Sequence, residues 1–291
     1  NTETWNGSSW TEVNNLNTAR GSAGGAGIST GALCVGGSPN PGYTESWNGT
    51  SWTEVSDLNS GRNELECAGL QPSMIAFGGA PGSGTAATEF WNGSSWTEVA
   101  DLATARFSVA GIGSSTAGLA GGGSTGSVTA VTEEFTAPSA FSKLNLGQVF
   151  FNSTTNTFRV TGPSIPGGTW ASGGNMNETR NNVMGQAAGS KTAALIWGGK
   201  QAPPASITKT ESYNGSSWSE VNDLNTARQY SGGAGTQTAA LAFGNTSSSG
   251  ITESWNGSSW TEVNDMNTGR NYVMWSGIQT SALAGAGYTT T

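Results

Sequence analysis

Polar and apolar residues alternate in two short stretches of the chain that stand close together. Residues 252–255 read TESW and residues 260–263 read WTEV, with NGSS between them. A period of two predicts strands with one buried face, and Asn-Gly tolerates the positive φ of a tight hairpin turn. We therefore predict a two-stranded outer hairpin over residues 252–263.

Two further segments complete the repeated unit. A Gly/Ala-rich stretch follows Arg228, and TAALAFG then occupies residues 238–244. A short apolar run that ends at glycine is typical of a strand buried on both faces. The unit thus contains four predicted strands, and we expect an all-β protein.

The unit recurs along the whole chain. Its Thr-Glu pair begins at Thr2, Thr44, Thr88, Thr132, Thr210 and Thr252, with intervals of 42, 44, 44, 78 and 42 residues. A period in the low forties with four strands per unit is typical of a β-propeller, in which each unit forms one blade.

The long interval contains 34 residues more than a normal unit. TEEFTAPSAFSKLNL, from Thr132, is interpreted as an outer hairpin in which Phe135 and Phe141 replace the tryptophans. GQVFFNSTTNTFRVTG at residues 147–162 indicates strand, turn and strand. Because Trp170 stands at the usual distance before the next repeated arginine, we predict an abbreviated extra blade at about 147–174.

This extra blade makes seven, and six blades with a long insertion is the alternative. The chain begins in an outer hairpin at residues 2–13 and ends after two inner strands at residues 271–287. We expect both ends to complete one blade, because such closure leaves no free sheet edge. The whole chain, residues 1–291, is expected to be a single domain. Since it starts at Asn1 without Met, we expect a leader or a longer polypeptide to precede it.

The repeated features are an arginine, a small inner strand, an apolar strand ending in Gly-Gly, and an aromatic residue with a tryptophan on the outer hairpin. With these features the chain resembles kelch repeats over nearly its whole length. TESWNGSSWTEV with LNTAR, and the GQVFFNSTTNTFRV hairpin, are similar to kelch-like propellers of tail and virion proteins of marine bacteriophages. The resemblance implies a binding or structural module whose loops face partners.

Composition and charge narrow the classes of function. The chain has 45 Gly and 12 Trp, and only 10% of its residues are charged, which is too little for ordinary disorder. The net charge is −8 and the 11 basic residues are scattered, so nucleic acid is not an expected partner. No apolar run reaches the roughly 18 residues of a membrane span. Cys34 and Cys67 are expected to be separate buried thiols.

The chain contains no histidine. This absence excludes a copper site of the galactose oxidase type, a Ser-His-Asp triad and most zinc sites. The Asp-box of sialidases is also missing, because Asn-Gly stands where its aspartate belongs. We therefore expect no enzyme. The alternative is a carbohydrate-active enzyme that uses the unrepeated carboxylates Glu64, Glu66 or Glu178.

Paired glutamates recur on the predicted outer hairpins. If Trp47 faces Trp52, then Glu45 faces Glu54 on the same side of the hairpin. The same register pairs Glu3 with Glu12, Glu89 with Glu98, Glu211 with Glu220 and Glu253 with Glu262, and it pairs Glu133 with Lys143. We expect no cofactor, although Ca²⁺ or a glycosidase-like pair would suit opposed carboxylates. Neutralisation by the repeated arginine or by solvent is the simpler interpretation.

An arginine precedes each predicted innermost strand except one, at Arg20, Arg62, Arg106, Arg180, Arg228 and Arg270. Together these side chains could form a cationic ring that binds an anionic glycan or phosphate. They could instead lock blade to blade through carboxylates and carbonyl groups. The tryptophan pairs recur in register, which favours packing over sugar binding.

Residues that depart from the repeat are better candidates for binding, because function can be added there without disturbing the fold. These candidates are Tyr43, Tyr230, Tyr272, Trp275 and the loop at residues 200–209. We expect a non-enzymatic propeller at a phage tail or virion surface, outside the cell, that contacts other virion proteins or a host-surface glycan. A purely structural virion protein is the alternative.

Overall fold

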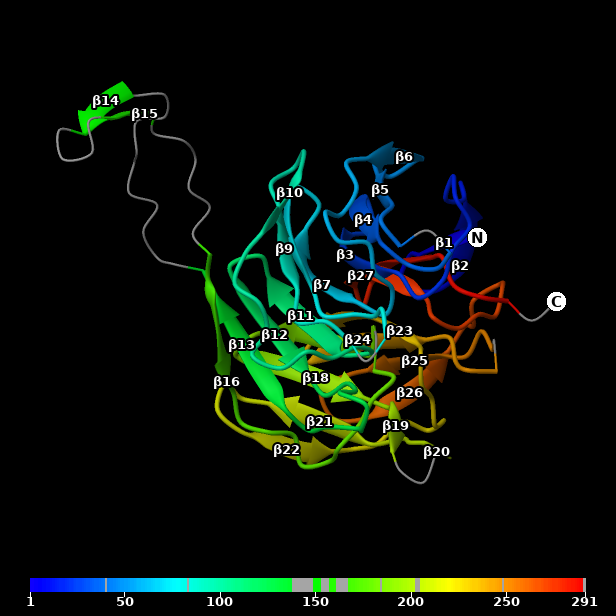
Figure 1. Cartoon of the computed structure of the whole chain (residues 1–291). Helices are drawn as coiled ribbons and strands as arrows, with labels where there is room; N and C mark the ends of the chain where they lie inside the picture. The colour runs from blue at the N-terminus through cyan, green and yellow to red at the C-terminus, as the bar shows by residue number, and fades with distance from the viewer. Residues whose placement is uncertain are drawn as a thin grey trace.

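The structure is a computed structural model. It describes residues 1–39, 41–82, 84–137, 149–152, 157–160, 167–183, 185–201, 205–247 and 249–289. Within these residues the chain forms six four-stranded antiparallel sheets. None of the described residues lies in a helix. Figure 1 shows the sheets as blades around a common axis. The expectation of an all-β propeller is confirmed.

The blades are numbered by the order of their innermost strands, and each is given from the axis outward. Blade 1 holds β3 (Gly24–Ile28), β4 (Gly31–Val35), β5 (Thr44–Trp47) and β6 (Trp52–Val55). Blade 2 holds β7 (Glu66–Leu70), β8 (Ser73–Phe77), β9 (Thr88–Trp91) and β10 (Trp96–Glu98). Blade 3 holds β11 (Ala110–Ser114), β12 (Ala117–Gly121), β13 (Thr132–Thr136) and β16 (Thr169–Ser172).

Blade 4 holds β17 (Ala187–Ser190), β18 (Ala193–Trp197), β21 (Thr210–Tyr213) and β22 (Trp218–Val221). Blade 5 holds β23 (Gly232–Thr236), β24 (Ala239–Phe243), β25 (Thr252–Trp255) and β26 (Trp260–Val263). Blade 6 holds β27 (Met274–Ile278), β28 (Ser281–Gly285), β1 (Thr2–Trp5) and β2 (Trp10–Val13). Two small sheets pair β14 (Val149–Asn152) with β15 (Thr157–Val160), and β19 (Lys200–Gln201) with β20 (Ala205–Ser206).

Both ends of the chain complete blade 6, as predicted. Strand β1 pairs with β28, with Thr2 opposite Gly285 and Trp5 opposite Ala282. Each inner strand also contacts the inner strand of the next blade, in the order β27, β3, β7, β11, β17, β23 and back to β27. The ring of blades is therefore closed by antiparallel pairing of the first strand with the last.

The prediction of a seventh blade is wrong, and the alternative of six blades with a long insertion is correct. Trp170 lies on β16, which pairs with β13 and sets Trp170 opposite Phe135. Residues 147–174 therefore supply the outer strand of blade 3 and the β14–β15 hairpin, rather than a blade of their own. Glu133 faces Ser172 instead of Lys143. Phe141 and Lys143 lie outside the described residues.

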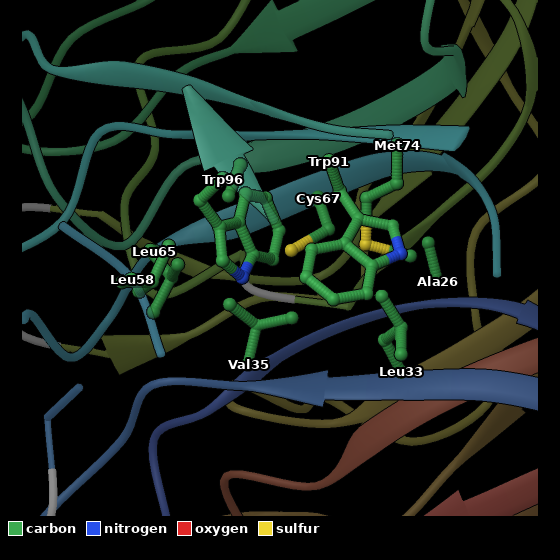
Figure 2. Packing of buried hydrophobic residues seen from close by; sticks show 10 residues of the cluster. Ala26, Leu33, Val35, Leu58, Leu65, Cys67, Met74, Trp91 and Trp96 are labelled. Atoms are coloured by element: carbon green, nitrogen blue, oxygen red, sulfur yellow. The ribbon is translucent and has the colours of Figure 1, made fainter. Parts of the chain in front are cut away.

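The paired aromatic residues pack within and between blades. The ring centroids of Trp47 and Trp52 lie 5.3 Å apart, and the indole N–H of Trp52 donates to Thr2 Oγ1 of blade 6 at 3.1 Å. Figure 2 shows the equivalent pair one blade further on, where Trp91 and Trp96 face Leu33 and Val35 of blade 1, although the indole N–H of Trp96 has no hydrogen-bond partner. These contacts agree with a packing function for the pairs. The two cysteines are buried and free, as predicted.

The penultimate residue of every inner strand is a glycine with positive φ. The six are Gly27, Gly69, Gly113, Gly189, Gly235 and Gly277, with φ between 105° and 135°. At Gly235 (φ 128°) a Cβ atom would lie 2.2 Å from the carbonyl oxygen of Ala239 on the next strand. Glycine is therefore required both for the backbone conformation and for the close strand approach.

We expect Gly235→Ala to lower the free energy of unfolding by roughly 2 kcal/mol, because strain at positive φ adds to a backbone clash. Urea unfolding checks this. Gly126→Ala is the matched control, because Gly126 also has positive φ (98°) but no atom lies within 4 Å of the added Cβ. If both variants lose the same free energy of unfolding, the backbone clash at Gly235 contributes nothing.

Candidate functional site

The inner strands all run in one direction along the axis, which gives the propeller two different faces. We call the side where these strands begin the N-face and the side where they end the C-face. On the N-face, the second residue after each repeated arginine has a left-handed backbone, with φ between 52° and 56°. These six residues, here called the N-face ring, are Ser22, Glu64, Ser108, Asn182, Tyr230 and Tyr272.

Backbone hydrogen bonds link neighbouring members of the N-face ring. Glu64 N donates to Ser22 O at 2.8 Å, and Ser108 N donates to Glu64 O at 3.0 Å. Tyr272 N donates to the carbonyl oxygen of Tyr230 at 2.9 Å. Non-glycine residues rarely adopt this conformation, and it persists only where the surroundings hold it. The fold thus fixes six backbone positions whose side chains differ from blade to blade.

Tyrosines gather on one half of this ring. The rings of Tyr230 and Tyr272 are stacked, with centroids 3.8 Å apart, and Tyr288 meets Tyr272 edge to face at 5.7 Å. Burial raises the pKa of Tyr230. Burial and a hydrogen bond with Tyr230 raise the pKa of Tyr272. Both phenols are therefore neutral at physiological pH and can donate hydrogen bonds.

Polar side chains form the other half of the ring. The hydroxyl of Ser108 donates to the Glu64 carboxylate, and Asn182 Nδ2 donates to Gln229 Oε1 at 2.7 Å. The charge of Glu64 contributes to the raised pKa values of Tyr230 and Tyr272, so this carboxylate lies close enough to act on both phenols. Ser22, Ser108 and Asn182 are buried, so the part of the ring that a polar ligand could contact is formed by the half-buried Glu64, Tyr230 and Tyr272.

The six repeated arginines lie behind this surface and are buried. Arg62 Nη1 donates to Glu89 Oε1 at 2.6 Å, and the same carboxylate accepts from Asn59 N at 2.8 Å and Asn59 Nδ2 at 2.9 Å. The side chains of all six arginines are at most 1% exposed. Their pairs are Arg20–Glu45, Arg62–Glu89, Arg106–Glu133, Arg180–Glu211, Arg228–Glu253 and Arg270–Glu3.

This arrangement corresponds to blade locking and not to an accessible anion site. Each arginine belongs to the connection from the preceding blade, and its carboxylate lies on the third strand of the next. The predicted register of the glutamates is confirmed, because Glu45 lies opposite Glu54. However, Glu45 is buried against N–H donors whereas Glu54 is exposed. A Ca²⁺ ion does not fit there, since it requires oxygen ligands free of such donors.

Residues from blades 2, 4 and 6 meet at the axis of the propeller. Glu66, the first residue of β7, is 1% exposed, and its Oε1 accepts a hydrogen bond from Gly185 N of blade 4 at 2.6 Å. A Cβ atom at Gly185 would lie 2.6 Å from the Trp275 ring of blade 6. Burial raises the pKa of Glu66 to about 8, although N–H groups of Gly185 and Cys67 oppose the shift. The nearby indole N–H of Trp275 also lowers the pKa of Glu66, although it forms no hydrogen bond with the carboxylate.

On the C-face of this crossing lies a cavity of about 200 Å³, here called the C-face cavity. All six inner strands line it, mostly with glycine and alanine, and Trp275 is part of its wall. Ile28, Leu70 and Ile278 also line it and are about half exposed, at 48%, 53% and 51%. The structure therefore separates three of the four predicted aromatic candidates, with Tyr230 and Tyr272 on the N-face and Trp275 at the axis.

The three unrepeated carboxylates contact different neighbours. Glu64 accepts from Ser108, Glu66 from Gly185 and Glu178 from Gln201. The loop at residues 200–209 contains the β19–β20 hairpin, and residues 202–204 lie outside the described part of the chain. Tyr43 is half-buried in a loop of blade 1. Among the described residues, no cluster of three or more carboxylate or thiol groups could hold a metal ion.

These observations define a six-bladed β-propeller with a polar aromatic ring on one face and an uncharged cavity on the other. No protein-family model and no curated protein matches the sequence. Among solved structures 224 chains match, including one titled "Structure of YjhT". It is 12% identical, with a TM-score of 0.64 over 95% of this chain and 93% of that one. Likeness at this level of identity shows the fold alone. Within the described residues, no helix has the length and apolarity needed to cross a membrane.

Sequence reasoning missed half of the N-face ring, although it had singled out Glu64 as an unrepeated carboxylate. It identified Tyr230 and Tyr272 as departures from the repeat, but it did not identify Ser108, Asn182 or Tyr288 as their neighbours. A comparison of the residues two positions after each repeated arginine would have found the ring. The residue type varies at this position, whereas the arginine before it is the same in every blade. Tyr288 gives no such signal in that comparison; it lies next to Tyr272 because the β27–β28 hairpin extends to a bridge between Asn271 and Tyr288.

Proposed function

We propose that this chain is a non-enzymatic binding propeller that holds its ligand at the N-face ring. One observation supports this most directly: the six positions share one backbone conformation, while their side chains are Ser, Glu, Ser, Asn, Tyr and Tyr. A purely structural position would repeat its residue, as the arginine before it does. Rigid aromatic rings beside hydrogen-bonding groups are typical of sites that recognise polar ligands.

The proposed setting is the surface of a virion, where the protein would support host attachment or contacts with other virion proteins. The similarity of the repeated unit to kelch-like propellers of marine phage tail proteins supports this setting. We propose a host-surface glycan as the ligand, because half-buried tyrosine rings beside the Glu64 carboxylate combine aromatic surface with a hydrogen-bond acceptor. The absence of histidine and the separate surroundings of Glu64, Glu66 and Glu178 favour binding over catalysis.

Replacing both stacked tyrosines is expected to weaken glycan binding by about 30-fold or more, since truncating a central aromatic contact typically costs about 2 kcal/mol. Tyr230→Ser with Tyr272→Ser is the variant of choice, because Ser22 and Ser108 already occupy the equivalent positions in two other blades. A saccharide array followed by calorimetry on the hits measures the effect. Glu54→Gln, at an exposed position on the outer strand of blade 1, is the control.

Four outcomes separate the candidate functions. Glycan binding that depends on Tyr230 and Tyr272 supports the proposal. Glycan binding that survives the double variant would place the site elsewhere, and absence of any glycan binding would favour a purely structural virion component. Release of reducing sugar from host polysaccharide, lost on substitution of Glu64, would favour the carbohydrate-active enzyme instead.

A further inference from the structure

The C-face cavity is uncharged throughout. None of the residues that line it is Asp, Glu, Lys or Arg, although the protein carries a net charge of −8. Its side chains include Ile28, Leu70, Ile112, Trp275 and Ile278, and the remaining wall is mainly glycine and alanine. Burying a charge in such surroundings is costly, so the cavity selects an uncharged and largely apolar occupant.

The rim of the cavity differs between its two halves. The last residue of the inner strand is Ile28 in blade 1, Leu70 in blade 2 and Ile278 in blade 6, and these three blades are neighbours. The equivalent residues of blades 3, 4 and 5 are Ser114, Ser190 and Thr236. One half of the rim is therefore apolar and the other half carries hydroxyl groups.

The fold does not require the apolar half. Blades 3 to 5 form the same inner hairpin with Ser or Thr at this position, as in the pairing of Ser114 with Ala117. Ile28, Leu70 and Ile278 bury only about half of their surface. Adjacent, half-exposed apolar side chains around a cavity are typical of an interaction site.

We propose that the C-face cavity receives one uncharged apolar side chain, between leucine and phenylalanine in size, from a protein partner. The volume fits, because an apolar cavity of about 150 Å³ accommodates benzene and this one holds about 200 Å³. The apolar rim favours a side chain on a polypeptide over a free small molecule, since the partner's adjoining chain would cover it. This site is independent of the N-face ring.

Capped amino acids provide the probes. N-acetyl-phenylalaninamide and N-acetyl-leucinamide are titrated into the full-length protein and followed by NMR chemical shifts, with N-acetyl-glycinamide and N-acetyl-lysinamide as comparators. We expect saturable binding of the apolar probes, at least tenfold tighter than that of the glycine and lysine probes. Equal affinity for all four probes would overturn the proposal. So would benzyl alcohol binding as tightly as the phenylalanine probe, because the rim would then contribute nothing.

Two variants locate the binding. Ala188→Ile narrows the cavity with the residue that Ile112 already places at the equivalent position of blade 3. Because Ala188 is also buried in the core beside Trp197, the NMR spectrum of the free variant checks that it is folded. Ala188→Ile should abolish probe binding. The triple variant Ile28→Ser, Leu70→Ser, Ile278→Ser copies the rim of the other blades and should weaken binding about tenfold. Tyr43→Ser is the control, and unchanged binding by Ala188→Ile would contradict the assignment.

Discussion

Glu66→Gln is expected to be more stable than the natural protein above pH 8, by a margin that vanishes near pH 5. Burial raises the pKa of Glu66 from its ordinary value of 4.5 to about 8 in the folded protein. Between these two values the folded state holds a proton that the unfolded state has released. The stability of the natural protein is therefore full below about pH 4.5 and falls as the pH rises to about 8.

The expected loss is on the order of 5 kcal/mol, since each unit of pKa difference corresponds to about 1.4 kcal/mol. Glutamine does not titrate, so its variant should lack this decline. Urea unfolding at pH 5, 7 and 9 measures the difference. Glu54→Gln, at an exposed position, is the control for the loss of one carboxylate. Parallel profiles for Glu66→Gln and the natural protein would show that Glu66 ionises without penalty.

Removing one partner of a buried arginine–glutamate pair is expected to lower the free energy of unfolding by about 3–5 kcal/mol. In Arg62→Met the Glu89 carboxylate loses its guanidinium partner while it remains buried at the joint between blades. In Glu89→Gln the guanidinium is left without a counterion, and one oxygen acceptor is replaced by a donor amide. The urea unfolding midpoint of each variant checks the expectation.

Glu98→Gln is the matched control for this pair. Glu98 lies directly opposite Glu89 on the outer hairpin but is exposed, so its change should cost less than about 0.5 kcal/mol. Combining Arg62→Met with Glu89→Met should recover only part of the loss, because the Asn59 N–H groups would still lack their acceptor. A small effect of Arg62→Met would contradict a locking function for the repeated arginine.

The N-face ring and the C-face cavity show how a repeated fold acquires individual features. The repeat fixes the backbone by the left-handed residue at one end of each inner strand and the glycine at the other. Side chains at the variable positions can then change without disturbing the blades. Tyr230 and Tyr272 on one face, and Ile28, Leu70 and Ile278 on the other, are such changes.

The sequence by itself determined the elements that depend on local chemistry. Alternation and Asn-Gly turns gave the outer hairpins and their register, with Glu45 opposite Glu54. The incomplete first and last units indicated that both ends of the chain complete one blade. These inferences succeeded because strand period and turn conformation are properties of neighbouring residues.

Only the tertiary structure decided which distant segments meet. Phe135 has its partner in Trp170, across a long insertion, and no local pattern distinguishes this pairing from that of an extra blade. Glu66 and Gly185 meet across the axis although 119 residues separate them. The burial that raises the pKa of Glu66 follows from closure of the ring, whereas the stacking of Tyr230 on Tyr272 follows from the packing of blade 5 against blade 6. Contacts of this kind depend on the whole packed ring and are not encoded in any single repeat.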